Sequence, residues 1–178
     1  MKFRALRAED IEVRVGNVFK SGVTFLLYKN ARVDMEILDE TLDPEYWQRD
    51  HKEIKGNMYC GIGIYNGMLK EWVWKWDCGT ESYTEKEKGE ASDSFKRAGF
   101  NWGIGRELYT APFIYLPCAT VPKQNGKGYD LNDPNEIKGI YVSTFETEEV
   151  NGKRVITKLE LSQHANRKEN VIYRWEKK

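Results

Sequence analysis

The segment NMYCGIGIYNGMLKEWVWKWDCG, residues 57–79, decides how the middle of the chain folds. Two runs rich in aromatic and β-branched residues flank Asn66-Gly67, a dipeptide that tolerates the positive backbone dihedrals of a type I′ turn. We therefore predict a β-hairpin with a two-residue turn. The register that follows pairs Tyr65 with Met68, Gly61 with Trp72 and Tyr59 with Trp74.

The two faces of this hairpin differ in chemistry. One face is mostly aliphatic, as in a protein core, and carries Met58, Cys60, Ile62, Ile64, Leu69 and Val73. The other sets aromatic rings beside bare backbone and carries Tyr59, Gly61, Gly63, Tyr65, Trp72, Trp74 and Trp76. These tryptophans either pack under a loop or at a subunit interface, or stay exposed and stack on bases.

The residues before the hairpin extend this fold. Residues 46–54 are expected to form a strand, which makes a three-stranded antiparallel meander with the hairpin. Apolar residues at helical spacing predict a short helix over residues 31–42, which Asp43-Pro44 ends. Residues 12–28 alternate in polarity around a turn at Lys20 to Gly22, so we predict an N-terminal hairpin there.

A long helix is predicted over residues 84–103, after the meander. It begins with Thr84 and acidic residues, a pattern typical of a helix N-terminus, and Gly103 and Gly105 end it. Its apolar stripe consists of Ala91, Phe95, Ala98 and Trp102. At about 100° per residue, Lys96 and Arg97 leave this stripe, and we expect them to project together from a packed helix.

The C-terminal third of the chain is expected to be an extension of this core. An apolar, irregular stretch reaches residue 122, and a loop rich in Gly, Asn, Asp and Pro follows. Alternating residues around Asn151-Gly152 predict another hairpin, and residues 171–175 predict one more strand. We therefore expect an α+β fold with a core over residues 1–122 and a β-rich extension over residues 123–178.

Composition limits the function classes. Lys and Arg together number 28, as do Asp and Glu, so a nucleic-acid site must be a local patch. The three cysteines have no paired spacing, and the two histidines lack ligand-like neighbours, so we expect neither a disulfide framework nor a metal site. No signal peptide or apolar run long enough to cross a membrane is apparent, which predicts a cytoplasmic protein.

Catalytic patterns are weak. Asp43 or Glu45 followed by Glu53-Ile54-Lys55 loosely resembles the acidic arrangement of some metal-dependent nucleases, which we keep as an alternative. Gly103-Ile104-Gly105 ends a predicted helix and is not followed by Gly-Lys-Ser/Thr, so it does not indicate an ATP site. We expect a protein that is not an enzyme and that needs no cofactor.

The remaining features suit single-stranded nucleic acid. Lys96 and Arg97 would supply fixed positive charges for phosphates, Arg32 opens the short helix, and aromatic rings accept any base. Two alternatives stay open for the basic pair: it solubilises the exposed side of the helix, or it forms ion pairs with Asp93 and Glu90.

Three segments carry a resemblance to the Rad-fifty-two family of single-strand DNA annealing proteins, including its phage recombinase branch. Asp93-Ser94-Phe95-Lys96-Arg97-Ala98, followed by Trp102-Gly103, resembles the signature helix of that family. Residues 28–47, from Tyr28-Lys29-Asn30-Ala31-Arg32 to Tyr46-Trp47, resemble its short helix, and Asp77-Cys78-Gly79 resembles the junction before its long helix. The resemblance covers residues 12–109, in the family's order of elements.

The resemblance implies a β-β-β-α core that assembles into rings or filaments, binds single-stranded DNA in a basic groove and anneals complementary strands without ATP. It implies that Lys96, Arg97 and Arg32 bind the DNA backbone. Phe100 stands where some members have a third basic residue, and Arg106 would complete the groove in its place. The expected partners are single-stranded DNA, further copies of the chain and a single-strand-binding protein, in the cytoplasm of a host cell if the chain is phage-encoded. A structural or protein-binding oligomer is a further alternative.

Overall fold

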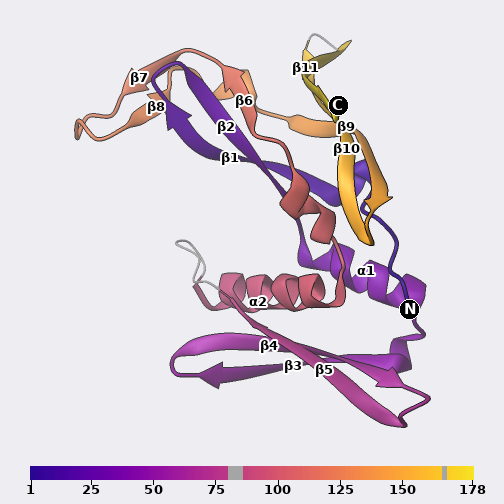
Figure 1. Ribbon diagram of the computed structural model, residues 1–178. Helices are drawn as coiled ribbons and strands as arrows, with labels where there is room; N and C mark the ends of the chain where they lie inside the picture. Colours follow the sequence, from indigo (N-terminus) through magenta and orange to yellow (C-terminus); the bar gives the residue numbers. More distant parts are fainter. Residues whose placement is uncertain (80–85, 166–167) are drawn as a thin grey trace. The chain divides into compact units, whose positions relative to one another are not determined.

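The computed structural model describes residues 1–79, 86–165 and 168–178. These residues form a mixed α+β fold with antiparallel sheets, which confirms the predicted class (Figure 1). The chain divides into two compact units. The first unit comprises Met1–Leu6 and Lys29–Arg106, and the second comprises Arg7–Tyr28 and Glu107–Lys178.

The first unit contains a three-stranded sheet and two helices. In chain order its elements are α1 (Ala31–Thr41), η2 (Pro44–Tyr46), β3 (Trp47–Ile54), β4 (Asn57–Asn66), β5 (Glu71–Cys78) and α2 (Lys86–Trp102). The strands lie in the order β3-β4-β5, each antiparallel to its neighbour. Helix α2 packs on one face of this sheet and also contacts α1, whereas no helix among the described residues of the first unit covers the opposite face (Figure 1).

The local patterns of the first unit confirm both predicted helices and all three strands, apart from the start of the long helix. The predicted cap at Thr84 lies outside the described residues. At the other end, Gly103 takes a φ of 97° and the amide of Ile104 donates to the carbonyl of Gly99 at 3.0 Å, so the helix ends where the glycines predicted.

The predicted register of the central hairpin is wrong. The turn spans residues 67–70, because the side-chain oxygen of Asn66 accepts hydrogen bonds from the amides of Met68 and Leu69 at 3.0 and 3.1 Å. Gly61 therefore pairs with Trp76 in place of Trp72, and Tyr59 pairs with Cys78 in place of Trp74. Since the displacement is an even number of residues, the two faces keep their predicted composition.

The aliphatic face of the sheet forms the core of the first unit. Cys60, Ile62 and Ile64 of β4 are buried against α2, whose Phe95 and Ala98 are also buried. Further buried side chains come from α1 and its surroundings: Phe3, Leu6, Val33, Ile37, Leu38 and Ile104. This packing fixes α2 on the sheet, and with it every side chain that the helix carries.

The second unit is almost entirely β-structure. Its strands are β1 (Ile11–Phe19), β2 (Gly22–Lys29, whose last residue belongs to the first unit), β6 (Ile114–Pro117), β7 (Thr120–Pro122), β8 (Tyr129–Leu131), β9 (Ile140–Val150), β10 (Lys153–Ala165) and β11 (Lys168–Glu176). Three short 3-10 helices are η1 (Ala8–Asp10), η3 (Arg106–Thr110, whose first residue belongs to the first unit) and η4 (Pro134–Ile137). The sheets have the strand orders β1-β2-β6, β11-β10-β9 and β7-β8.

The three hairpin and strand predictions in this unit are confirmed. Residues 20 and 21 separate β1 from β2, Asn151 and Gly152 separate β9 from β10 with positive φ at both residues, and β11 contains residues 171–175. The predicted loop after residue 122 also contains β8 and η4. Residues 7–28 group with the C-terminal strands in the second compact unit.

Candidate nucleic-acid interface

The four predicted site residues, Arg32, Lys96, Arg97 and Arg106, all belong to the first unit. Arg32 lies in the first turn of α1. Asn30 caps this turn, because its side-chain oxygen accepts hydrogen bonds from the amides of Arg32 and Val33 at 2.9 and 3.3 Å. The Arg32 side chain is exposed, and within the described ranges it forms no ion pair. It is therefore accessible to an anionic ligand.

Lys96 and Arg97 do not project together. The Lys96 side chain is only 15% exposed and its Nζ lies 3.8 Å from Asp93 Oδ1, while its charge also acts on Asp34 of α1. Arg97 is 45% exposed, and its Nε donates to Asp77 Oδ1 of β5 at 3.2 Å. Because neighbouring residues lie about 100° apart on a helix, one cation turns toward α1 and the other toward β5. The prediction of ion pairing with Asp93 is confirmed for Lys96.

Arg106 binds the C-terminal end of α2. Its Nε and Nη2 donate to the carbonyl of Phe100 at 3.0 and 2.7 Å, and Nη2 also donates to the carbonyl of Asn101 at 3.1 Å. The carbonyl of Phe100 also accepts from the amide of Gly103 at 3.0 Å, and the guanidinium adds further hydrogen bonds at this helix end. Since Phe100 and Asn101 follow Lys96 and Arg97 by four residues each, the Arg106 charge lies about one turn further along α2.

A polar network that the sequence analysis did not identify joins β5 to α2. Asn101 Nδ2 donates to Asp77 Oδ2 at 3.1 Å and to the carbonyl of Trp76 at 3.0 Å, while Arg97 binds the other oxygen of Asp77. Lys75 Nζ donates to the carbonyl of Asn101 at 2.9 Å and lies 4.3 Å from the centre of the Trp102 ring. Side chains alternate between the two faces of β5, so Lys75 and Asp77 lie on the face that α2 covers. This alternation was visible in the sequence and could have identified the network.

A buried ion pair, also missed by the sequence analysis, joins the start of α1 to α2. Lys29 Nζ is bonded to Asp34 Oδ1, and both side chains are almost fully buried. The same ammonium donates to the carbonyl of Lys96 at 3.3 Å and lies 4.3 Å from the centre of the Phe100 ring. Phe100 therefore covers a buried cation in the structure.

The buried carboxylate of Asp34 is only partly satisfied by hydrogen bonds and nearby cations. Asp34 Oδ2 is buried without a hydrogen-bond partner, and desolvation raises the pKa of this carboxyl group to about 6 although Lys29 and Lys96 act in the opposite direction. A β-carbon at Gly99 would lie only 2.2 Å from Asp34 Oδ1, so the pair fits only against a glycine. The sequence gives no signal for this pair, because charged residues near a helix start are normally solvated.

The aromatic face of the sheet lies opposite α2. Trp76 and Trp74 lie against Gly61 and Gly63, where added β-carbons would come within 2.5 and 2.8 Å of the rings. The two rings stack with centroids 5.6 Å apart. Lys52 Nζ lies 4.4 Å from the centre of the Trp76 ring and 3.5 Å from Asp50 Oδ2. Trp74 and Trp76 are half-buried on this face, whereas Trp72 is exposed.

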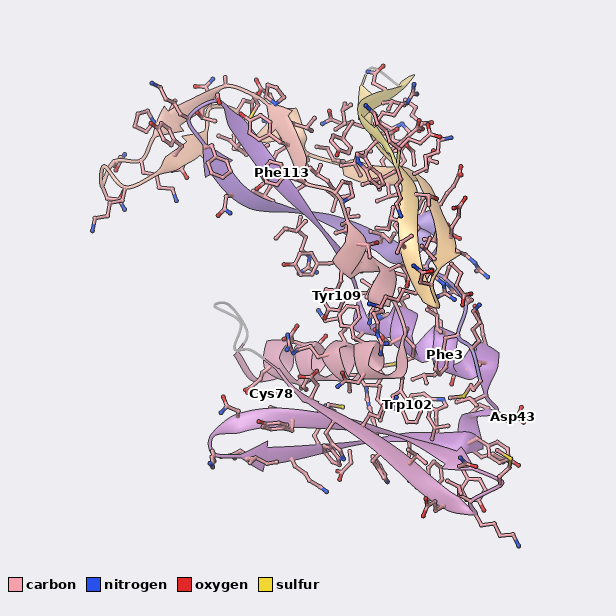
Figure 2. All side chains as sticks on the ribbon, in the orientation of Figure 1. Phe3, Asp43, Cys78, Trp102, Tyr109 and Phe113 are labelled. Carbon is pink, nitrogen blue, oxygen red and sulfur yellow. The ribbon has the colours of Figure 1, made fainter. Side chains whose placement is uncertain are left out.

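The arrangement around α2 can hold anions by charge and by donated hydrogen bonds. Trp102 stabilises this end of the helix: its indole nitrogen donates to the carbonyl of Ile62 at 2.9 Å, between helix and sheet (Figure 2).

Among the described residues, no three His, Cys, Asp or Glu side chains are grouped so that they could hold a metal ion. In the same ranges, no helix is long and apolar enough to cross a membrane.

Comparison with known proteins adds no relative. No family model, no curated protein and no solved structure matches the chain.

Proposed function

We propose that the chain is an ATP-independent single-stranded DNA-binding protein that anneals complementary strands in recombination and repair. The observation that carries this proposal is the set of exposed arginines around one packed helix pair. Arg32 begins α1, Arg97 lies on the exposed side of α2, and Arg106 caps its end. Side chains on packed helices can hold a phosphate backbone without reading bases.

The proposal also rests on the resemblance to the Rad-fifty-two family. We propose that β3, β4, β5 and α2 correspond to the β-β-β-α core of that family. In this reading Arg32, Arg97 and Arg106 contact DNA directly. Lys96 contributes mainly through its charge, because its side chain is largely covered and lies near Asp93. The buried Lys29–Asp34 pair supports the site by fixing the start of α1 against α2.

Annealing requires that the backbone is held while the bases remain available to a second strand. Cations at backbone positions meet this requirement, and many copies in one assembly add avidity along a continuous strand. We propose that the chain forms homo-oligomers, rings or filaments, and that the aromatic face of the sheet takes part in their interfaces. A single-strand-binding protein is a further proposed partner, and the cytoplasm is the proposed location.

Annealing of two labelled complementary oligonucleotides without any nucleotide cofactor tests this function. We expect wild-type protein to accelerate annealing, and we expect the variant Lys96→Ala with Arg97→Ala to lose most of this activity. The matched control is Lys127→Ala with Lys138→Ala, which removes two exposed positive charges from the second unit and should anneal normally. If the Lys96 and Arg97 variant binds and anneals like wild type, the site assignment is wrong.

A purely structural or protein-binding oligomer is a second candidate, favoured by the exposed apolar residues of the β4–β5 hairpin. Met68 and Leu69 at its tip are 93% and 61% exposed, and Trp72 is 36% exposed. This candidate predicts assembly by size measurement, with and without DNA, and no change in the mobility of a labelled oligonucleotide. The proposed annealing function predicts a mobility change that decreases with added salt.

A further inference from the structure

Two cations meet at one oxygen atom at the end of α2. Lys75 Nζ of β5 and Arg106 Nη2 both donate to the carbonyl of Asn101, at 2.9 and 3.1 Å. The ammonium and the guanidinium are therefore separated by no more than the sum of these two distances. Both side chains are exposed, and within the described residues neither forms an ion pair with a carboxylate.

The helix end accounts for only part of this positive charge. The C-terminus of an α-helix carries about half a negative charge, which one cation more than compensates. Arg106 alone already caps the carbonyls of Phe100 and Asn101. The second cation adds like charge at short range, an arrangement that an anionic ligand would stabilise.

The two donors are also held in place. The Lys75 ammonium lies 4.3 Å from the centre of the Trp102 ring, and the indole nitrogen of Trp102 is itself bonded to the carbonyl of Ile62. A lysine has three N–H donors and an arginine has five, so both groups keep donors after binding the helix. The remaining donors can bind one oxyanion at the surface.

We propose that Lys75 and Arg106 together form a phosphate-binding site at the C-terminal end of α2. The site rests on the proposed function, since it takes one backbone phosphate of the bound single strand. It extends the row of cations past Arg97, whose partner Asp77 is hydrogen-bonded to the Asn101 side chain. The same chemistry would also accept free inorganic phosphate.

The test is the salt dependence of oligonucleotide binding. Dissociation constants of a fluorescent thymidine oligonucleotide are measured for wild type and Lys75→Gln over a series of NaCl concentrations. We expect weaker binding, and a slope of log K against log [NaCl] that is smaller in magnitude by about 0.7, the value for one phosphate contact on a single strand. Lys75→Arg should keep the wild-type slope. Lys127→Gln, at an exposed position of the second unit, should also keep it.

Two further variants check that the cations share one ligand. If Lys75 and Arg106 hold the same phosphate, the effects of Lys75→Gln and Arg106→Gln on affinity should be less than additive in the double variant. Lys75→Gln with the wild-type slope and affinity would overturn the proposal. Should Lys75→Gln fail to fold, acetylation of the wild-type protein decides. The oligonucleotide must protect Lys75 and leave the exposed Lys127 reactive, and equal protection of the two lysines contradicts the site.

Inorganic phosphate separates this site from the proposed function. If wild type does not bind the oligonucleotide at all, single-strand binding is wrong. The melting temperature with phosphate, against chloride at equal ionic strength, then decides the site alone. A rise in wild type that is absent in Lys75→Gln supports a site for free phosphate, whereas equal responses of the two proteins overturn it.

Discussion

The ammonium of Lys29 and the carboxylate of Asp34 form a buried ion pair at the point where α1 meets α2. Lys29 is the last residue of β2, and Asp34 lies in the first turn of α1. The pair therefore links the entry of one helix to the carbonyl of Lys96 on the other. The cost of burying two charges makes this contact sensitive to the loss of either partner.

Lys29→Met should destabilise the protein, because it leaves the Asp34 carboxylate buried without its counter-charge. We expect a loss of about 3–5 kcal/mol at neutral pH, measured by urea denaturation followed by circular dichroism. Lys29→Met combined with Asp34→Leu should recover much of this loss, since it removes both charges. Lys52→Met is the control, because Lys52 pairs with Asp50 at the surface and its removal should have little effect.

Stability should also depend on the protonation of Asp34. Burial raises its pKa from 3.8 to about 6, so the native state binds a proton more tightly than the unfolded chain does. Protonation of Asp34 therefore contributes its full stabilisation below about pH 4, and this stabilisation is lost as the pH rises through about 6. Each unit of difference between the native and unfolded pKa corresponds to about 1.4 kcal/mol of unfolding free energy. Urea denaturation of wild type and Asp34→Asn over this range checks the sign. The unfolding free energy of wild type must fall relative to that of Asp34→Asn as the pH rises. A relative increase would contradict the prediction.

Gly61→Ala should disturb the aromatic face. The added β-carbon would lie 2.5 Å from the Trp76 ring, so the ring must leave the backbone. We expect a loss of about 1–3 kcal/mol in unfolding free energy and a change in tryptophan fluorescence. Gly67→Ala is the matched control on the same hairpin, because nothing lies within 4 Å of its added β-carbon. Unchanged fluorescence in a folded Gly61→Ala protein would show that Trp76 does not rest on Gly61.

The sequence predicted the local elements because their signals are local. Asn151-Gly152 identified a hairpin, and apolar spacing identified both helices. The predicted register of the central hairpin is wrong because the side-chain oxygen of Asn66 accepts hydrogen bonds from the amides of Met68 and Leu69, which lengthens the turn. Turn geometry of this kind is not determined by the polarity pattern of the strands.

The partners of the site residues could not be predicted for a different reason. The position of Lys96 on α2 followed from helical periodicity, but its burial depends on how α1 packs against that helix. Arg97 binds Asp77, which is distant in sequence, so the contact depends on the docking of α2 on β5. Lys29 and Asp34 lie close in the chain, yet their burial depends on the same helix packing, which sequence patterns do not specify.

The pairing of Arg97 with Asp77 leads to a prediction of increased binding. The carboxylate competes with phosphate for the same guanidinium, so Asp77→Asn should strengthen single-strand binding. The one side-chain oxygen of the asparagine can still accept from either the Cys78 amide or the Asn101 side chain, which bind different oxygens of Asp77. We expect up to about a fivefold gain in affinity by fluorescence anisotropy, since a partly exposed ion pair contributes about 0 to 1 kcal/mol. Asp50→Asn removes the same charge from the opposite face of the sheet and should leave affinity unchanged. The gain must disappear when Asp77→Asn is combined with Arg97→Ala, because the interaction of the Arg97 guanidinium with phosphate is its source. A gain that persists in that double variant would instead indicate a general effect of net charge.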